Sequence, residues 1–237
     1  MQYKTAVITG ASRGLGKAIA AKFAERRLNV FLASRSESDL RSIVQTQSSQ
    51  FGENVAYKQT DLTSADSISA MIESARNRFG KIDVLINNAG IGTYKPLVEW
   101  TEREIIDTVN VNLTALILAS KAVLPEMIAE KKGLIVNIAS DLSRRFLANM
   151  APYVATKFAV LGFSGSLLRE VKQFGVKVCT VMPGIIDTNF NNSKEGTREE
   201  TWALPVSRMA EVIASLLDQP EHLIMDEIVV HPLQQDF

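Results

Sequence analysis

The stretch TAVITGASRGLGKAIA, residues 5–20, decides the fold. A short apolar run leads into Gly10, Gly14 and Gly16, and residues typical of an amphipathic helix follow. Where a buried strand turns directly into a helix, the free N–H groups and the positive end of the helix dipole attract anions. Glycines permit the tight turn and the close approach of backbone to a pyrophosphate. The stretch predicts a phosphate-binding turn; a purely structural turn is the alternative, and its place after the first strand weakens it.

The same alternation of apolar runs and amphipathic segments continues along the chain, which indicates parallel strands joined by helices. We predict an α/β fold, a doubly wound parallel sheet of about seven strands with helices on both faces, in a single domain covering 1–237. The expected strands lie at 5–9, 29–34, 54–60, 83–88, 134–140, 176–182 and 226–230. The expected helices lie at 15–28, 37–50, 64–79, 101–131, 151–174 and 207–218.

Composition excludes several classes of protein. Lys+Arg and Asp+Glu are both 26, so the formal charge is zero and no basic surface for nucleic acid is indicated. No run has the length of a membrane span and the N-terminus does not resemble a signal peptide, so we expect a cytoplasmic protein without a membrane partner. The lone Cys179 lies in an expected strand and is read as core packing, and we predict no metal site.

The second strand ends with Ser34 and Arg35, where many dinucleotide-binding folds place an acidic residue that binds the adenosine ribose. A carboxylate would repel a 2′-phosphate, whereas a guanidinium binds it through charge-assisted hydrogen bonds. NADP(H) is therefore favoured over NAD(H), and Arg13 in the glycine turn could add a second contact. Solvated surface charge is the alternative for both arginines.

Two further strand ends carry polar or small residues at the edge where open α/β sheets bind ligands. Asp61 closes the third strand and either contacts the adenine or caps the helix that follows. The fourth strand ends in NNAG, in which Asn88 can bind neighbouring backbone, while Ala89 and Gly90 leave room for a ligand.

The stretch APYVATKFAV, residues 151–160, places Tyr153 and Lys157 four residues apart behind Pro152. One helical turn would put both on the same face. An ordinary helix-surface pair is the alternative. A nearby ammonium favours a phenolate, so we expect Lys157 to lower the pKa of Tyr153.

These motifs together resemble the classical short-chain dehydrogenase/reductase family. TGASRGLG, NNAG, Asn112 in VNVNLTAL, Ser140 in IVNIAS, YVATK and MPGIIDT occur in the family's order and approximate spacing, over essentially the whole chain. The resemblance implies a Rossmann-type fold and an NADP(H)-dependent carbonyl reductase that also works as an alcohol dehydrogenase. A dinucleotide-binding sensor or scaffold without useful turnover is the alternative.

The resemblance also implies residue roles. Tyr153 is expected to be the general acid or base, Lys157 to hold the nicotinamide ribose, Ser140 to bind the substrate oxygen, and Asn112 to hold a water that relays protons. The residues expected to bind the cofactor are Gly10, Ser12, Arg13, Gly14, Leu15, Gly16, Ser34, Arg35, Asp61, Leu62, Asn88, Ala89, Gly90, Tyr153, Lys157, Pro183, Gly184, Ile186 and Thr188.

The substrate is expected to be a small ketone, an aldehyde, or a 3-oxoacyl or hydroxy-acid compound. The polar stretch 187–205 is either a lid over it or a surface loop, and Trp202 and Leu204 either line the pocket or pack against the body of the domain. Arg144 and Arg145 either attract an anionic substrate or, as the favoured alternative, form contacts between subunits or are simply exposed to solvent. By family resemblance we expect a homodimer or homotetramer, in which small residues of 151–174 would permit close helix packing.

Overall fold

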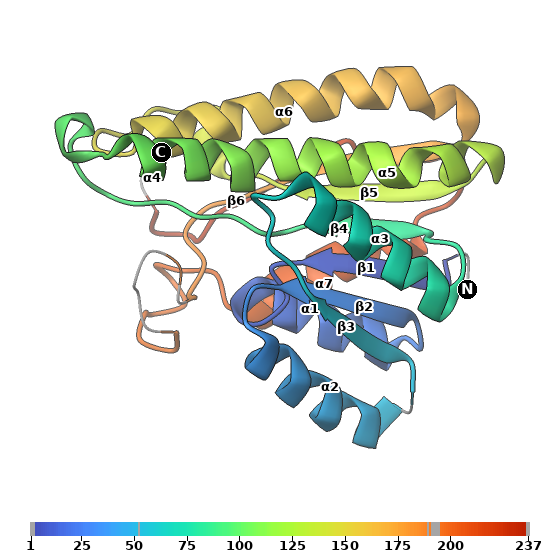
Figure 1. The fold of residues 1–237 in the computed structure, drawn as a ribbon. Coiled ribbons are helices and arrows are strands. Elements are labelled where there is room, and N and C mark those ends of the chain that lie inside the picture. The colour runs from blue at the N-terminus through green and yellow to red at the C-terminus, as the bar shows by residue number, and fades with distance from the viewer. Residues whose placement is uncertain (1–2, 52, 189, 191–194, 236–237) are drawn as a thin grey trace.

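The computed structural model describes residues 3–51, 53–188, 190 and 195–235 (Figure 1). Seven strands form one parallel sheet in the order β3-β2-β1-β4-β5-β6-β7. The strands are β1 Thr5–Thr9, β2 Asn29–Ser34, β3 Val55–Gln59, β4 Val84–Asn87, β5 Gly133–Ile138, β6 Val176–Pro183 and β7 Glu227–Val230. Every residue of β1, β4, β5 and β6 is buried, as expected for strands covered on both faces. The predicted fold class is confirmed.

Helices cover the two faces of the sheet. On one face, α1 Gly14–Glu25, α2 Glu37–Phe51 and α7 Val206–Ser215 share a core with β1, β2 and β4. On the other, α3 Ala65–Phe79, α5 Ala115–Ala129 and α6 Ala151–Val171 share a second core. Apolar side chains at helical spacing face the sheet; in α1 these are Ile19, Phe23 and Ala24.

The helix expected at 101–131 is divided in the structure. Thr101 begins α4, Glu102–Val109, with a capping box to Glu104, and a π-helical turn, Asn110–Thr114, then leads into α5. The wider turn directs Asn112 inward, where it is 2% exposed. The helix ends at Ala129, Lys131 takes the left-handed conformation (φ 51°), and Gly133 is the first residue of β5.

The sheet order places a cleft above the carboxyl ends of the strands. The chain runs outward from β1 to β2 and β3, then returns to β4 on the other side of β1. The connection from β1 leads to β2 on one side of the sheet, and the connection from β4 leads to β5 on the other side. Open α/β sheets bind ligands between two strands whose connections diverge in this way.

Candidate active site

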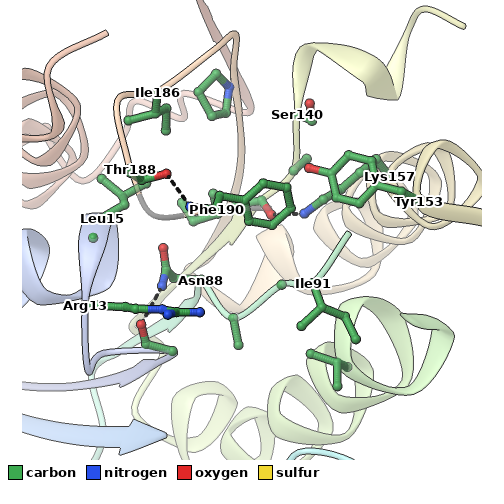
Figure 2. A pocket seen from close by; sticks show the side chains of 18 of the residues that line it. Arg13, Leu15, Asn88, Ile91, Ser140, Tyr153, Lys157, Ile186, Thr188 and Phe190 are labelled. Atoms are coloured by element: carbon green, nitrogen blue, oxygen red, sulfur yellow. Dashed lines mark hydrogen bonds between the residues drawn. The ribbon is translucent and has the colours of Figure 1, made fainter. Parts of the chain in front are cut away.

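A cleft of about 640 Å³ lies along this edge (Figure 2). Its volume is within the range of pockets that hold small molecules and cofactors. Most residues predicted from the sequence line it: Gly10, Ser12, Arg13, Gly14, Leu15, Ser34, Arg35, Leu62, Asn88, Ala89, Gly90, Ser140, Tyr153, Lys157, Pro183, Gly184, Ile186 and Thr188. Three predicted residues, Gly16, Asp61 and Asn112, do not line the cleft.

The glycine turn after β1 is shaped for a close ligand. Gly10 has φ 65°, and a Cβ there would lie 2.8 Å from the Cα of Ala89. Gly16 packs behind the turn, where a Cβ would lie 2.4 Å from the carbonyl oxygen of Gly10. Gly14, with φ 52°, faces Thr188 across the cleft. No side chain caps the N-terminus of α1, so its N–H groups are available to a phosphate. This part of the cleft fits a pyrophosphate.

Asn88 supports the turn from the end of β4. Its Nδ2 donates to the carbonyl oxygens of Thr9 (3.0 Å) and Gly10 (3.1 Å). The hydroxyl of Thr9 accepts from the backbone N–H groups of Asn88 (3.1 Å) and Ala89 (3.2 Å). The sequence analysis missed Thr9, because a threonine at a strand end has no signal that distinguishes it from core packing.

The end of the cleft at Arg13, Ser34 and Arg35 is called here the adenosine end. Ser34 is buried and its hydroxyl accepts from the backbone N–H of Ser36 at 3.2 Å. Arg13 and Arg35 are both exposed, and within the described part of the chain neither guanidinium has a hydrogen-bond or ion-pair partner. Both cations are therefore available to a phosphate group.

Asp61 is not the helix cap that the sequence left open, because the N-cap of α3 is Ser64, whose hydroxyl accepts from the N–H of Ser67. Its carboxylate accepts from the backbone N–H (2.9 Å) and the hydroxyl (2.8 Å) of Thr63. These hydrogen bonds hold the pKa of Asp61 below its ordinary value. The neighbouring Leu62 lines the cleft instead.

The other end, called here the carbonyl end, brings Ser140, Tyr153 and Lys157 together. Tyr153 and Lys157 lie on successive turns of α6, which begins with Pro152 in its first turn. The Nζ of Lys157 lies 5.4 Å from the centroid of the Tyr153 ring and donates to the carbonyl oxygen of Ile138 at 2.9 Å. Ser140 follows β5, and its hydroxyl acts on the phenol in the direction that lowers the pKa of Tyr153.

Burial sets the protonation of this pair. It raises the pKa of Tyr153 well above the ordinary value of 10.0, and the Asp141 carboxylate acts in the same direction. It lowers the pKa of Lys157 to about 8. The expectation that Lys157 lowers the pKa of Tyr153 is therefore wrong for this structure, because burial of the phenol is the largest influence and raises its pKa.

Asn112 does not present its side chain to the cleft. Its Oδ1 accepts from the N–H of Ile91 (2.8 Å), and its Nδ2 donates to the carbonyl oxygen of Ile91 (2.8 Å) and to the hydroxyl of Thr156 (3.1 Å). The amide thus fixes the chain after β4, including Ile91, which lines the cleft. These hydrogen bonds hold the segment after β4 in place, and none of them supports the expected role of Asn112 in holding a water.

The turn after β6 closes the cleft from above. Pro183, Gly184 and Ile186 line it, and Thr188 accepts from the N–H of Phe190 at 3.3 Å. Phe190 lies against Tyr153 with ring centroids 5.7 Å apart (Figure 2), a contact that the sequence analysis missed. Phe190 belongs to the expected lid 187–205, of which residues 189 and 191–194 lie outside the described residues.

The two side chains proposed as pocket lining within this loop are placed elsewhere. Leu204 pairs with Ile186 through an isolated bridge and is buried in the core beneath the turn. Trp202 is half-exposed and does not line the cleft. For Leu204 the alternative of packing against the domain is confirmed.

Arg144 and Arg145 do not offer free charge to a substrate. Arg144 forms an ion pair with Glu227 on β7, and Arg145 forms one with Asp141. Because each guanidinium faces a carboxylate of the protein, the possibility that they attract an anionic substrate is not supported. The remaining wall is apolar and includes Leu142, Leu147 and Met150.

The fold and the cleft define a dinucleotide-binding α/β enzyme, and the comparisons with known proteins give its family. The family model described as short chain dehydrogenase matches residues 4–199, and the chain belongs to this family. It is an oxidoreductase of the kind that acts on CH–OH and C=O groups, as predicted.

Three similar proteins illustrate the range of the family. The 3-oxoacyl-acyl-carrier-protein reductase FabG of Vibrio cholerae is 37% identical over 213 residues, which are 89% of this chain and 86% of that protein. An alcohol dehydrogenase from Thermococcus sibiricus, solved with 5-hydroxy-NADP, has a TM-score of 0.93 at 33% identity and 98% coverage of both chains. A metagenomic short-chain oxidoreductase solved with NADP has a TM-score of 0.85 at 32% identity, also with 98% coverage of both chains. The prediction of NADP(H) as cofactor is confirmed.

Proposed function

We propose that the protein is an NADPH-dependent carbonyl reductase that acts reversibly as an alcohol dehydrogenase on a small, uncharged ketone or aldehyde. One observation carries this proposal: Ser140, Tyr153 and Lys157 meet at one end of the cleft. The other end has an uncapped helix N-terminus and two exposed arginines without a hydrogen-bond or ion-pair partner among the described residues. A binding-only sensor would not need this buried group of three, so their arrangement favours an enzyme.

The roles of the chain's residues follow from their positions. Bound NADPH supplies the hydride for the carbonyl carbon. The phenol of Tyr153, kept protonated by its burial, gives a proton to the carbonyl oxygen in reduction and accepts one in alcohol oxidation. The Lys157 ammonium, which donates to the carbonyl oxygen of Ile138, would hold a ribose hydroxyl of the cofactor. Arg13 and Arg35 bind the 2′-phosphate.

The lining of the carbonyl end supports an uncharged substrate. Leu142, Leu147, Met150 and Phe190 give it an apolar wall, and the nearby Arg145 is neutralised by Asp141. A carboxylate against this apolar wall would lose its hydration, and Arg145 would not compensate it. The similarity to FabG keeps a 3-oxoacyl thioester as the second candidate. The stretch 187–205 would close over either substrate, with Phe190 as the side chain that reaches Tyr153.

A homodimer or homotetramer in the cytoplasm completes the proposal. The stretch Glu102–Ala129 is long and apolar enough to cross a membrane by length and composition alone, a test that core helices also pass, and 39% of its most apolar window is buried. On α6, Ala155 and Gly162 are exposed, and a Cβ on Gly162 would meet nothing within 4 Å. These surfaces suit close packing of helices from a second copy. A monomeric mass in solution would contradict this part of the proposal.

The test is oxidation of NADPH by the purified protein, followed by absorbance, with small ketones, diketones, aldehydes, hydroxy acids and 3-oxoacyl thioesters. We expect turnover with uncharged ketones or aldehydes, and we expect Tyr153→Phe to reduce it by about a thousandfold or more, since it removes the transferable proton. NADPH binding should be retained in the variant. Tight NADPH binding by the wild-type protein without turnover on any of these compounds would favour the sensor.

A further inference from the structure

Two turns border the carbonyl end of the cleft, one after β5 and one after β6. Residues 140–142 of the first turn and residues 183–186 of the second line the cleft. The two strands are neighbours, and just beyond β5 the N–H of Ala139 still donates to the carbonyl oxygen of Val181 at 2.8 Å. Among the described residues, no backbone hydrogen bond joins 140–145 to 184–188. The relative position of the two turns therefore depends on side chains.

The side-chain amide of Gln235, from the segment after β7, connects the two turns. Its Nε2 donates to Oδ2 of Asp141 at 2.6 Å, and its Oε1 accepts from the N–H of Ile185 at 2.8 Å. The reverse orientation of the amide would place its oxygen against a carboxylate and its NH₂ group against an N–H, so both contacts require the arrangement that is present. Gly184 leaves room for the amide, because a Cβ there would collide with Oε1 of Gln235. Gln235 does not line the cleft, so it acts on bound molecules only through the two turns.

Asp141 connects this amide to Ser140. Its Oδ1 accepts from the hydroxyl of Ser140 at 3.0 Å, while its Oδ2 accepts from Gln235 and from Arg145. The Ser140 oxygen also accepts from the N–H of Leu142 at 3.2 Å. Asp141 is 7% exposed, and a buried carboxylate that loses a donor is left partly unsatisfied. Removal of the Gln235 amide should therefore disturb the side chain that holds the Ser140 hydroxyl.

The segment that carries Gln235 is itself held against the domain. The N–H of Gln234 donates to the carbonyl oxygen of Thr201 at 2.9 Å, and the N–H of Gln235 donates to that of Pro232 at 3.3 Å. These backbone hydrogen bonds direct the chain back toward the turns after it leaves β7. The amide thus has a fixed position from which it can hold both turns.

We propose that Gln235 is a positioning residue, which fixes the turn that carries Ser140 relative to the turn expected to bind the cofactor. Ser140 is expected at the substrate oxygen, so the amide sets how the substrate lies against the cofactor during reduction. The inference rests on the proposed function, because it assigns Gln235 a role in the same reaction. A small displacement matters for such a step, since a misplacement of about 1 Å can reduce a rate about a hundredfold.

Gln235→Leu removes both hydrogen bonds with little change in side-chain size. We expect kcat for reduction to fall about tenfold to a hundredfold, because the two turns lose their common partner. The KM for NADPH should change by less than about threefold, since its phosphates are bound at the other end of the cleft. Gln234→Leu is the matched control in the same segment, where the glutamine is exposed, and it should leave both constants unchanged. Wild-type kcat in Gln235→Leu would overturn the inference.

Gln235→Glu separates positioning from packing. An ionised glutamate has no hydrogen for Asp141, whereas a protonated one can donate to Asp141 and accept from Ile185 as the amide does. The titratable groups that face this position are Asp141 and Arg145 from the turn after β5 and His231 from the same segment. The carboxylate of Asp141 should raise the pKa of the introduced glutamate above its ordinary value of about 4.3.

The activity of Gln235→Glu, divided by that of the wild type, should therefore rise as pH falls from about 8 to about 5. The same ratio for Gln235→Leu should stay constant, because leucine cannot titrate. A constant ratio for Gln235→Glu would overturn the inference. If Gln235→Leu does not fold, the recovery of Gln235→Glu at low pH decides alone.

Hydrogen exchange tests the connection between the turns without turnover. In Gln235→Leu, amide hydrogens in 140–145 and in 184–188 should exchange at least about threefold faster than in the wild type, because both turns lose a hydrogen bond. Gln234→Leu should keep the wild-type rates in both turns. Unchanged exchange in 140–145, or an equal increase in all segments of the domain, would overturn the inference.

These outcomes are distinguishable from failure of the proposed function. Loss of turnover in Tyr153→Phe together with wild-type kcat in Gln235→Leu would retain the reductase and reject the positioning role. Absence of wild-type turnover would reject the reductase, while hydrogen exchange would still decide whether Gln235 holds the two turns together.

Discussion

At the adenosine end of the cleft, Arg13 and Arg35 are exposed and have no hydrogen-bond or ion-pair partner among the described residues. Near the carbonyl end, Arg144 and Arg145 lie outside the cleft lining and face the carboxylates of Glu227 and Asp141. The same residue type thus has two uses around one cleft. An unpaired guanidinium keeps its hydrogen-bond donors for a ligand, and a paired one directs a carboxylate of the protein. The contrast predicts that charge changes alter cofactor choice at one end and proton transfer at the other.

The largest effect is expected at Lys157, the buried cation of the carbonyl end. Burial lowers its pKa from 10.5 to about 8, and each unit is worth about 1.4 kcal/mol. Keeping the ammonium charged at pH 7 therefore costs about 3 kcal/mol of stability. Lys157→Met should reduce turnover by about a thousandfold. It should also raise the free energy of unfolding at pH 7 by about 2 kcal/mol, after loss of the hydrogen bond to Ile138 is subtracted.

The size of this stability effect depends on pH. Between about pH 8 and pH 10.5 the unfolded lysine binds more protons than the folded one, so wild-type stability rises with pH through this window. The advantage of Lys157→Met in urea unfolding should therefore shrink as pH approaches 10.5. The exposed Lys172, at the end of the same helix, provides the control substitution Lys172→Met. A variant less stable than wild type at pH 7 would show that the buried ammonium is not costly.

A substitution at Arg35 tests whether the arginines of the adenosine end bind the cofactor. Arg35→Asp removes a charge-assisted contact to the 2′-phosphate and adds a repulsive one, so the KM for NADPH should rise about tenfold to a hundredfold. The KM for NADH, which lacks that phosphate, should change by less than about threefold. Steady-state kinetics with both cofactors measure this.

Arg41 is the matched control for Arg35. It lies on α2, outside the cleft, and forms an ion pair with Glu37. Arg41→Ala should leave both KM values unchanged. Equal losses with NADPH and NADH in Arg35→Asp would show that Arg35 does not read the 2′-phosphate.

The adenosine end could be predicted from the sequence because its features are local. The glycine turn, Ser34 and Arg35 each follow a strand directly, and strand ends of a parallel sheet meet at one edge. Tyr153 and Lys157 were predictable for the same reason, since a spacing of four places them on one helical face.

The carbonyl end depends on contacts between distant segments, and these have no sequence signal. Gln235 reaches Asp141 only because the strand order places β7 beside β6 and β6 beside β5. The direction in which the pKa of Tyr153 shifts was predicted wrongly. The spacing of Tyr153 and Lys157 in the sequence indicates a nearby ammonium, but it does not indicate the loss of solvent around the phenol. Phe190 and Thr9 were missed because an apolar or hydroxyl side chain in a loop or strand has many ordinary explanations.

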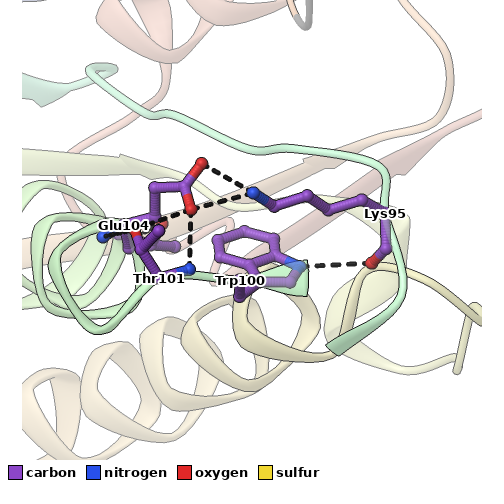
Figure 3. A network of polar contacts seen from close by, with 5 residues as sticks. Lys95, Trp100, Thr101 and Glu104 are labelled. Atoms are coloured by element: carbon purple, nitrogen blue, oxygen red, sulfur yellow. Dashed lines mark hydrogen bonds and ion pairs between the residues drawn. The ribbon is translucent and has the colours of Figure 1, made fainter. Parts of the chain in front are cut away.

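The smallest effect is expected at a paired cation outside the cleft. In the segment between β4 and α4, Lys95 donates to both carboxylate oxygens of Glu104 at 2.8 Å and lies 5.6 Å from the ring centroid of Trp100 (Figure 3). Glu104 also accepts from the N–H and hydroxyl of Thr101. The hydrogen bond from Lys95 and those from Thr101 lower the pKa of Glu104 from 4.5 to about 2.

Glu104→Gln should lower the melting temperature at pH 7 by a few degrees and leave the KM for NADPH unchanged, since an exposed ion pair contributes little and neither Lys95 nor Glu104 lines the cleft. The carboxylate stabilises the fold fully above about pH 4.5, and this contribution is lost as pH falls toward about 2. The difference between variant and wild type in thermal unfolding should therefore narrow on acidification. Glu102→Gln, in the same helical turn but outside the network, should show no such narrowing. A large change in the KM for NADPH in Glu104→Gln would contradict the distinction between cationic side chains that bind a ligand and those, such as Lys95, that only form ion pairs within the protein.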